Sequence, residues 1–141
     1  METARTKAVV KRLVAHGRMA FIEGATEEQI EAFERKYDMV LPERHKEWLR
    51  FSDGGELFLP AGVQLYGVAH KPMIDTADDN RPSERYVVIG AMASGDPILF
   101  ERGTENVAIF NREAWQIEEG ESYKDFFAFV NDLYEILWIE D

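Results

Sequence analysis

Residues 26–56 read TEEQIEAFERKYDMVLPERHKEWLRFSDGGE, and this stretch predicts two amphipathic helices joined by a short turn. Thr26 and Gln29 have the spacing of a capping box, in which each side chain binds a free backbone N–H of the first helical turn. One apolar stripe follows at helical spacing, and it contains Ile30, Phe33 and Tyr37. The stretch therefore predicts a docking platform rather than a catalytic site.

The second helix of the stretch is expected to begin at Pro42, because a proline at the first helical position loses no hydrogen bond. Trp48, Leu49 and Ser52 share one face of this helix. The pair Gly54-Gly55 is expected to end it, since glycine readily adopts the left-handed backbone of a helix end.

This pattern resembles the opening of the SUKH superfamily (the Smi/Knr group), which contains bacterial toxin-immunity proteins and fungal regulators of cell-wall assembly. The residues that carry the resemblance are Ile30, Phe33, Glu34, Tyr37, Leu41, Pro42, Trp48, Leu49, Gly54 and Gly55. Asp38 departs from the family pattern, because a glycine commonly follows the tyrosine, and Ser52-Asp53 departs from it just before the glycines. An aspartate tolerates a left-handed helix end, so the fold expectation stands. The resemblance implies a protein-binding domain that blocks a toxin or regulates an endogenous partner.

Length and composition indicate a single soluble domain over residues 1–141. Hydrophobic residues make up 45% of the chain, enough to build one core. The chain has no cysteine, which excludes disulfides and thiolate metal sites. The longest charge-free run, residues 57–70, is too short to span a bilayer, and no secretory signal is recognised. We therefore expect a cytoplasmic protein.

The charge of the chain is strongly negative and unevenly distributed. Sixteen basic and 27 acidic residues give a net charge of −11. Residues 1–22 carry +4, whereas residues 113–141 carry −8. An acidic surface repels phosphate backbones and anionic lipids, so we expect no nucleic-acid or membrane binding. The same surface attracts basic protein partners, although solubility alone is an alternative reason for it.

The rest of the chain predicts an α+β fold, with N-terminal helices, a central antiparallel sheet of about five to six strands and a C-terminal helix. A first helix is expected over residues 3–16, although its basic face also suits a transit peptide or a phosphate-binding arm. Strands are predicted at residues 63–68, 86–92, 98–100, 106–110 and 115–118, with a shorter strand before Pro60. The short turns between the later strands favour an antiparallel meander over βαβ units.

The last helix is expected to begin at a second capping box, formed by Ser122 and Asp125. Its apolar stripe contains Phe126, Phe129, Val130, Leu133 and Leu137, widened by Phe127, Tyr134 and Trp138. We interpret this stripe as core, although an aromatic stripe also suits a ligand cleft.

No constellation of residues in the chain indicates catalysis. The three histidines, His16, His45 and His70, lie far apart in the sequence, and no nucleophile or zinc motif appears. Because His45 stands between Arg44 and Lys46, it is expected to be a partly exposed surface residue. We predict that the chain is not an enzyme, holds no cofactor and has no metal site.

Two acidic clusters are the predicted partner-binding residues. The first contains Glu56 together with Asp75, Asp78 and Asp79 of the long polar connection over residues 71–85, and the second contains Glu118, Glu119 and Glu121. Loops on a rigid scaffold often carry recognition, which favours the first cluster, although its aspartates also suit turns or a hard cation. The glutamates of the second equally suit the positive end of the last helix. The expected partner is a basic toxin domain, often a nuclease, bound by a monomer or weak homodimer.

Overall fold

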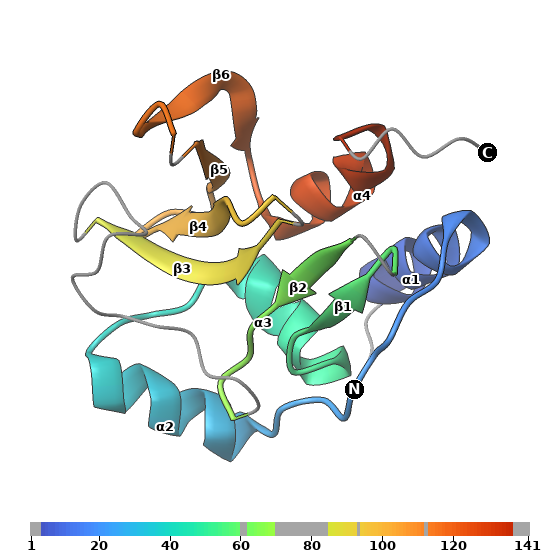
Figure 1. The fold of residues 1–141 in the computed structure, drawn as a ribbon. Helices are drawn as coiled ribbons and strands as arrows, with labels where there is room; N and C mark the ends of the chain where they lie inside the picture. The colour runs from blue at the N-terminus through green and yellow to red at the C-terminus, as the bar shows by residue number, and fades with distance from the viewer. Residues whose placement is uncertain (1–3, 60–61, 70–84, 93, 112, 137–141) are drawn as a thin grey trace.

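The computed structural model describes residues 4–59, 62–69, 85–92, 94–111 and 113–136, which form an α+β fold (Figure 1). The helices are α1 (Ala4–His16), α2 (Glu27–Tyr37), α3 (Glu43–Phe51) and α4 (Phe126–Ile136). The strands are β1 (Gly55–Leu57), β2 (Val63–Leu65), β3 (Tyr86–Ala91), β4 (Pro97–Glu101), β5 (Val107–Asn111) and β6 (Gln116–Tyr123). The predicted fold class is confirmed.

The strands form one sheet in chain order, β1-β2-β3-β4-β5-β6, and each neighbouring pair is antiparallel. The predicted meander is therefore confirmed. The register slips in β6, because Ile117 pairs with Phe110 whereas Ser122 pairs with Ala108. β6 advances further than β5 between these two pairs, so residues 118–121 form a bulge at this edge of the sheet.

The main core lies between one face of the sheet and all four helices. Alternate strand residues point into it, as the period of a pleated strand requires. Its members include Ile89, Ile98, Phe100 and Ile109 from the strands and Leu13, Phe33, Trp48, Phe126 and Phe129 from the helices. The apolar stripe of α4 is therefore core, as interpreted from the sequence.

The stretch that predicts the fold forms the local structures expected of it. Thr26 Oγ1 accepts a hydrogen bond from the N–H of Gln29 at 3.1 Å, and Gln29 Oε1 accepts one from the N–H of Thr26 at 2.9 Å. Asp38 ends α2 with a φ of 50°, in the left-handed region. Gly54 has a φ of 100°, and a Cβ there would lie 2.5 Å from the carbonyl oxygen of Leu65. Only glycine fits this position.

Three boundaries differ from the expectation. Pro42 precedes α3, which begins at Glu43. Ser122 lies in β6, and it is Asp125 that caps α4, where its Oδ1 accepts a hydrogen bond from the N–H of Ala128 at 2.8 Å. Trp115 belongs to the turn before β6 rather than to a strand. The difference at Ser122 is caused by strand pairing, since β6 remains paired with β5 as far as Tyr123 and this pairing holds Ser122 extended.

His45 is buried, so the expectation of a partly exposed residue is wrong. Its side chain is 2% exposed and its ring stacks on Phe126, with 4.8 Å between the ring centroids. Among the described residues Nδ1 has no hydrogen-bond partner, and burial lowers the pKa of His45 from 6.5 to about 3. Successive helix residues point in directions about 100° apart, so the charged neighbours Arg44 and Lys46 do not indicate where His45 points.

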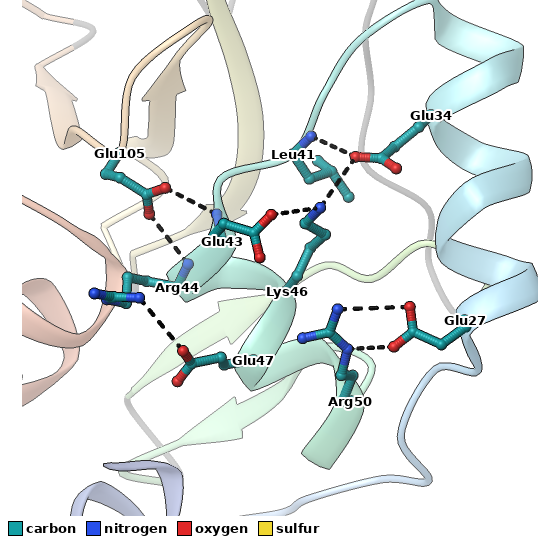
Figure 2. A network of polar contacts seen from close by, with 9 residues as sticks. All are labelled: Glu27, Glu34, Leu41, Glu43, Arg44, Lys46, Glu47, Arg50 and Glu105. Carbon is teal, nitrogen blue, oxygen red and sulfur yellow. Dashed lines mark hydrogen bonds and ion pairs between the residues drawn. The ribbon is translucent and has the colours of Figure 1, made fainter. Parts of the chain in front are cut away.

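A polar network joins α2 to α3 (Figure 2). Lys46 Nζ lies 3.7 Å from a carboxylate oxygen of Glu34, and the same oxygen accepts a hydrogen bond from the N–H of Leu41 at 2.8 Å. Arg50 and Glu27 form a second ion pair between the two helices, and its hydrogen bond lowers the pKa of Glu27. These carboxylates are already paired within the chain, so they hold the two helices together.

Glu105, in the turn between β4 and β5, caps α3 from a distant part of the chain (Figure 2). Its carboxylate accepts hydrogen bonds from the N–H of Glu43 at 2.8 Å and the N–H of Arg44 at 3.1 Å. Pro42 provides no side-chain cap at this end of the helix. Glu105→Ala is therefore expected to lower the free energy of unfolding by about 1–2 kcal/mol, as loss of a helix cap does.

Urea unfolding of Glu105→Ala and the parent measures this effect. Glu105→Gln keeps one acceptor oxygen and should lose less, whereas Glu113→Ala, at an exposed turn position, should lose less than about 0.5 kcal/mol. Equal stability of Glu105→Ala and Glu113→Ala would show that the cap does not stabilise the fold.

Candidate functional site

The predicted partner-binding residues are distributed over separate regions. Glu56 is exposed in the middle of β1, between two buried neighbours, so it points away from the main core. Asp75, Asp78 and Asp79 lie outside the described residues. Glu118, Glu119 and Glu121 lie in the bulge of β6, the strand that precedes α4. β1 and β6 are opposite edges of the sheet, which keeps Glu56 apart from this bulge.

The face of the sheet that points away from the helices carries a second apolar cluster. This outer-face cluster consists of Val88 in β3, Leu99 in β4 and Phe110 in β5, all of them buried. Tyr66, Tyr86 and Ile117 are partly buried and pack against it. In the described part of the chain these packing side chains come from strands and adjoining turns, and none comes from a helix. Tyr66, Tyr86 and Ile117 therefore form a rim around the cluster, on the side of the sheet opposite the main core.

Trp115 extends this rim into solvent. Its ring packs edge-on against Phe110, with 4.9 Å between the centroids and 76° between the planes. More than half of the residue is nevertheless exposed, at 52%. Its backbone is left-handed, with a φ of 56°, a conformation that is uncommon for a bulky residue. Trp115 thus combines a fixed aromatic contact on one side with a free surface on the other.

A groove of about 300 Å³ lies beside this rim. Ile117 connects the two features, because it pairs with Phe110 and also lines the groove. The groove is further lined by Tyr86, Glu101 and Ala108 from the neighbouring strands and by Ser122 and Lys124 at the end of β6. Glu101 forms an ion pair there with Arg85 at 3.6 Å. The groove is therefore a shallow polar and aromatic depression rather than an enclosed ligand cavity.

A larger hollow, of about 650 Å³, lies at the C-terminal end of α2. Met39 and Val40 supply its apolar lining, but its charged groups have both signs. The carboxylates belong to Glu31, Glu34 and Asp38, and the guanidinium groups to Arg35 and Arg102. Mixed charges of this kind favour neither a cation nor an anion, so the outer face of the sheet is the stronger candidate for recognition.

The buried carboxylate of Asp53 is structural. It accepts hydrogen bonds from the N–H of Val68 at 2.7 Å and the N–H of Ala69 at 2.9 Å, which ties the end of α3 to the segment after β2. Across the described ranges, no group of three or more His, Cys, Asp or Glu side chains is arranged to hold a metal ion. In the same ranges, no helix has the length and apolar character needed to cross a membrane.

Sequence reasoning missed the outer-face residues, because their roles depend on the sheet. Trp115, Tyr86 and Ile117 were interpreted only as members of strands. A signal was present in the sequence, since Trp115 stands in a segment that carries four glutamates and no basic residue between positions 113 and 123. A large aromatic residue in a strongly charged segment indicates an exposed aromatic side chain, and such side chains are enriched at protein interfaces.

Comparison with known proteins gives one family. The model of the SMI1 / KNR4 family (SUKH-1) matches residues 24–132, which include α2, α3 and the whole sheet. No curated protein matches the chain.

Proposed function

The chain belongs to the SMI1 / KNR4 family (SUKH-1), and on this premise we propose that it is a non-enzymatic module that binds and neutralises a cognate toxin domain. Membership of this family supports a protein-binding immunity or regulatory module in general. Neutralisation of a toxin, the basic character of that toxin and an encounter in the cytoplasm are the specific parts of the proposal.

The observation that carries the proposal is the outer face of the sheet. Tyr66, Tyr86, Ile117 and Trp115 place apolar and aromatic groups at or near the surface there, on the side where no described helix packs. Aromatic residues are enriched at protein–protein interfaces because they combine a large contact area with few rotatable bonds. A rigid sheet keeps such groups in place before a partner arrives, which reduces the entropy lost on binding.

The charge of the chain favours a basic partner. A net charge of −11 draws basic proteins toward the surface and increases their association rate. A nuclease is basic where it holds phosphate, so an acidic protein occupies its groove in place of the nucleic acid. Neutralisation then follows from exclusion of the substrate and requires no reaction by the bound module.

A regulatory or scaffolding role, with a partner from the same cell, is the alternative. Family membership supports it equally, because membership supports an immunity or regulatory module only in general. The two functions differ in what they require, since an immunity protein is needed only where its toxin is present.

Co-expression tests the proposal. Each toxic domain encoded beside the gene for this chain is expressed in bacteria, with and without the chain, and survival is measured. We expect the chain to restore growth for one such domain and to abolish its nuclease activity when the purified proteins are mixed. Loss of growth on deletion of the chain in cells without any toxin, combined with no rescue, would support the regulatory alternative instead.

Binding is expected to depend on the acidic cluster outside the described residues. Replacing Asp75, Asp78 and Asp79 together with asparagine should weaken the toxin complex by about tenfold or more, equivalent to roughly 1.4 kcal/mol. The reason is that each lost carboxylate leaves a basic group of the partner unpaired. Stability should stay within about 1 kcal/mol of the parent, because isolated surface charges contribute little to folding.

A matched triple variant distinguishes the effect of losing this cluster from the effect of changing the net charge. Glu28→Gln, Glu31→Gln and Asp132→Asn remove the same charge from exposed helix positions. Calorimetry of each variant with the neutralised toxin should show a much smaller loss for this control. Equal losses would make the effect one of net charge, and unchanged affinity of the aspartate variant would place the site elsewhere.

A further inference from the structure

We infer that Trp115 is the anchor of the docking face, and that the partner segment it contacts carries an apolar side chain flanked by lysine or arginine. This inference rests on the proposed function in requiring a protein partner, but it does not require that partner to be a toxin. It assigns the contact to one side chain and states the chemistry that the side chain recognises.

The backbone of Trp115 is the first observation. Three non-glycine residues have positive φ values: Asp38, Phe58 and Trp115, within the described ranges. Asp38 ends a helix, where a left-handed residue is expected, and Phe58 is buried in the main core. Trp115 lies in the hairpin turn between β5 and β6, where a left-handed residue is common but is rarely one as bulky as tryptophan. Unfavourable backbone conformations persist where the surrounding structure holds them, and they concentrate at functional sites.

The packing of Trp115 is the second observation. The ring makes a T-shaped contact with Phe110, which is itself fully buried in the outer-face cluster. Ile117, two residues later, pairs with Phe110 and forms part of the groove wall. A partner that covers the exposed part of Trp115 therefore meets the groove as well, and a volume of about 300 Å³ accommodates a side chain. A fixed aromatic ring beside a depression is the usual geometry of an interface hot spot.

The charge of the chain indicates the kind of partner. Glu113 is exposed in the same turn as Trp115, and the whole chain carries a net charge of −11. The lining of the groove contributes little to this charge, because Glu101 is paired with Arg85 and Lys124 is basic. A second copy of this chain would bring like charges together, and anionic lipid would be repelled for the same reason. The complementary surface is a basic protein segment with an apolar centre.

Trp115→Gly tests the anchor without harming the fold. Glycine adopts a φ of 56° freely, so the substitution removes the ring and relieves the backbone. The midpoint of urea unfolding is expected to equal or exceed that of the parent. Trp115→Phe keeps an aromatic ring at the same place. Val14→Ser removes a comparably exposed apolar side chain, 57% exposed on α1, and is the matched control.

The probe is a phage-displayed library of random twelve-residue peptides, selected on the immobilised parent chain. We expect the selected peptides to contain an aromatic or aliphatic residue flanked by lysine or arginine. A synthetic peptide made from such a sequence should bind Trp115→Gly about tenfold or more weakly than the parent. Trp115→Phe should retain most of the affinity, and Val14→Ser all of it.

Several results would overturn the inference. Selection of no peptide, of peptides without basic residues, or of peptides that bind Trp115→Gly as well as the parent would each do so. Sedimentation showing a parent dimer that Trp115→Gly dissociates would identify a second copy as the occupant instead. Because the peptide selection uses no toxin, its result can still be interpreted if the co-expression test fails. A toxin neutralised equally by Trp115→Gly would refute the anchor alone.

Discussion

Trp48→Ala is expected to lower the free energy of unfolding by about 3–5 kcal/mol, the largest loss from any single substitution considered. Trp48 is 0% exposed and its Nε1 donates a hydrogen bond to the carbonyl oxygen of Gly54 at 3.0 Å. Its ring contacts Phe21, Phe51 and Phe126, with centroid distances of 5.9, 5.4 and 5.6 Å. Alanine would leave a cavity among these rings and would remove one of the two hydrogen bonds that the carbonyl oxygen of Gly54 accepts, the other coming from the Ser52 hydroxyl at 2.9 Å, which explains the size of the loss.

Urea unfolding measures this loss, and two further variants serve as comparisons for it. Trp48→Phe fills most of the cavity but cannot donate to Gly54, so its loss should lie between those of the parent and Trp48→Ala. Trp115→Ala removes the same kind of side chain from a half-exposed site and should lose about 1 kcal/mol or less. A loss below about 1 kcal/mol for Trp48→Ala would mean that the core around α3 does not depend on this ring.

Acid is expected to destabilise the parent far more than His45→Phe. Burial lowers the pKa of His45 from 6.5 to about 3 in the folded chain, whereas the unfolded chain keeps the ordinary value. As the pH falls from 6.5 to 3, His45 takes up a proton in the unfolded state but not in the folded state. Stability associated with His45 is therefore complete above pH 6.5 and is lost between these two values.

The expected difference grows by about 1.4 kcal/mol for each pH unit below 6.5, so at pH 5 it is roughly 2 kcal/mol. Phenylalanine cannot titrate, preserves the stack on Phe126 and removes the unpartnered Nδ1. At pH 8 the two proteins should therefore differ by less than about 1.5 kcal/mol. Both retain His16 and His70, whose contributions cancel in the comparison.

Chemical denaturation at several pH values between 8 and about 4.5 measures this difference. Parallel stability curves for the parent and His45→Phe would show that His45 takes up its proton equally in the folded and unfolded states. A curve for His45→Phe that falls more steeply than the parent would reverse the sign and place a stabilising partner on the charged ring.

Local chemistry in the sequence was sufficient to predict several features. The Thr26–Gln29 capping box and the left-handed Asp38 involve residues at most a few positions apart, so the interactions that stabilise them are visible in the chain itself. The meander followed from short turns between apolar segments, since closely spaced strands return antiparallel. The pair Gly54-Gly55 was expected to end the second helix, and α3 ends shortly before it, at Phe51, while the φ of 100° at Gly54 is one that glycine adopts readily.

The candidate site was predicted less completely. Glu56 is exposed in β1, as a partner-binding residue requires, but the importance of Trp115 and the groove beside it was not predicted. Glu118, Glu119 and Glu121 belong to β6, and the length of this strand was not predicted, because it remains paired with β5 through Tyr123. Strand pairing is a contact between distant residues, and no local pattern shows where it stops.

The sequence by itself determined the helices, the order of the strands and the acidic character, because these depend on neighbours along the chain and on composition. Only the tertiary structure decided that His45 is buried under Phe126, that Glu105 caps α3 and that Trp115 packs on Phe110. Two of these contacts join residues more than sixty positions apart, and the third depends on which side of the sheet Phe110 points to. Burial and capping are properties of the space around a side chain, and that space is created when the helices pack against the sheet.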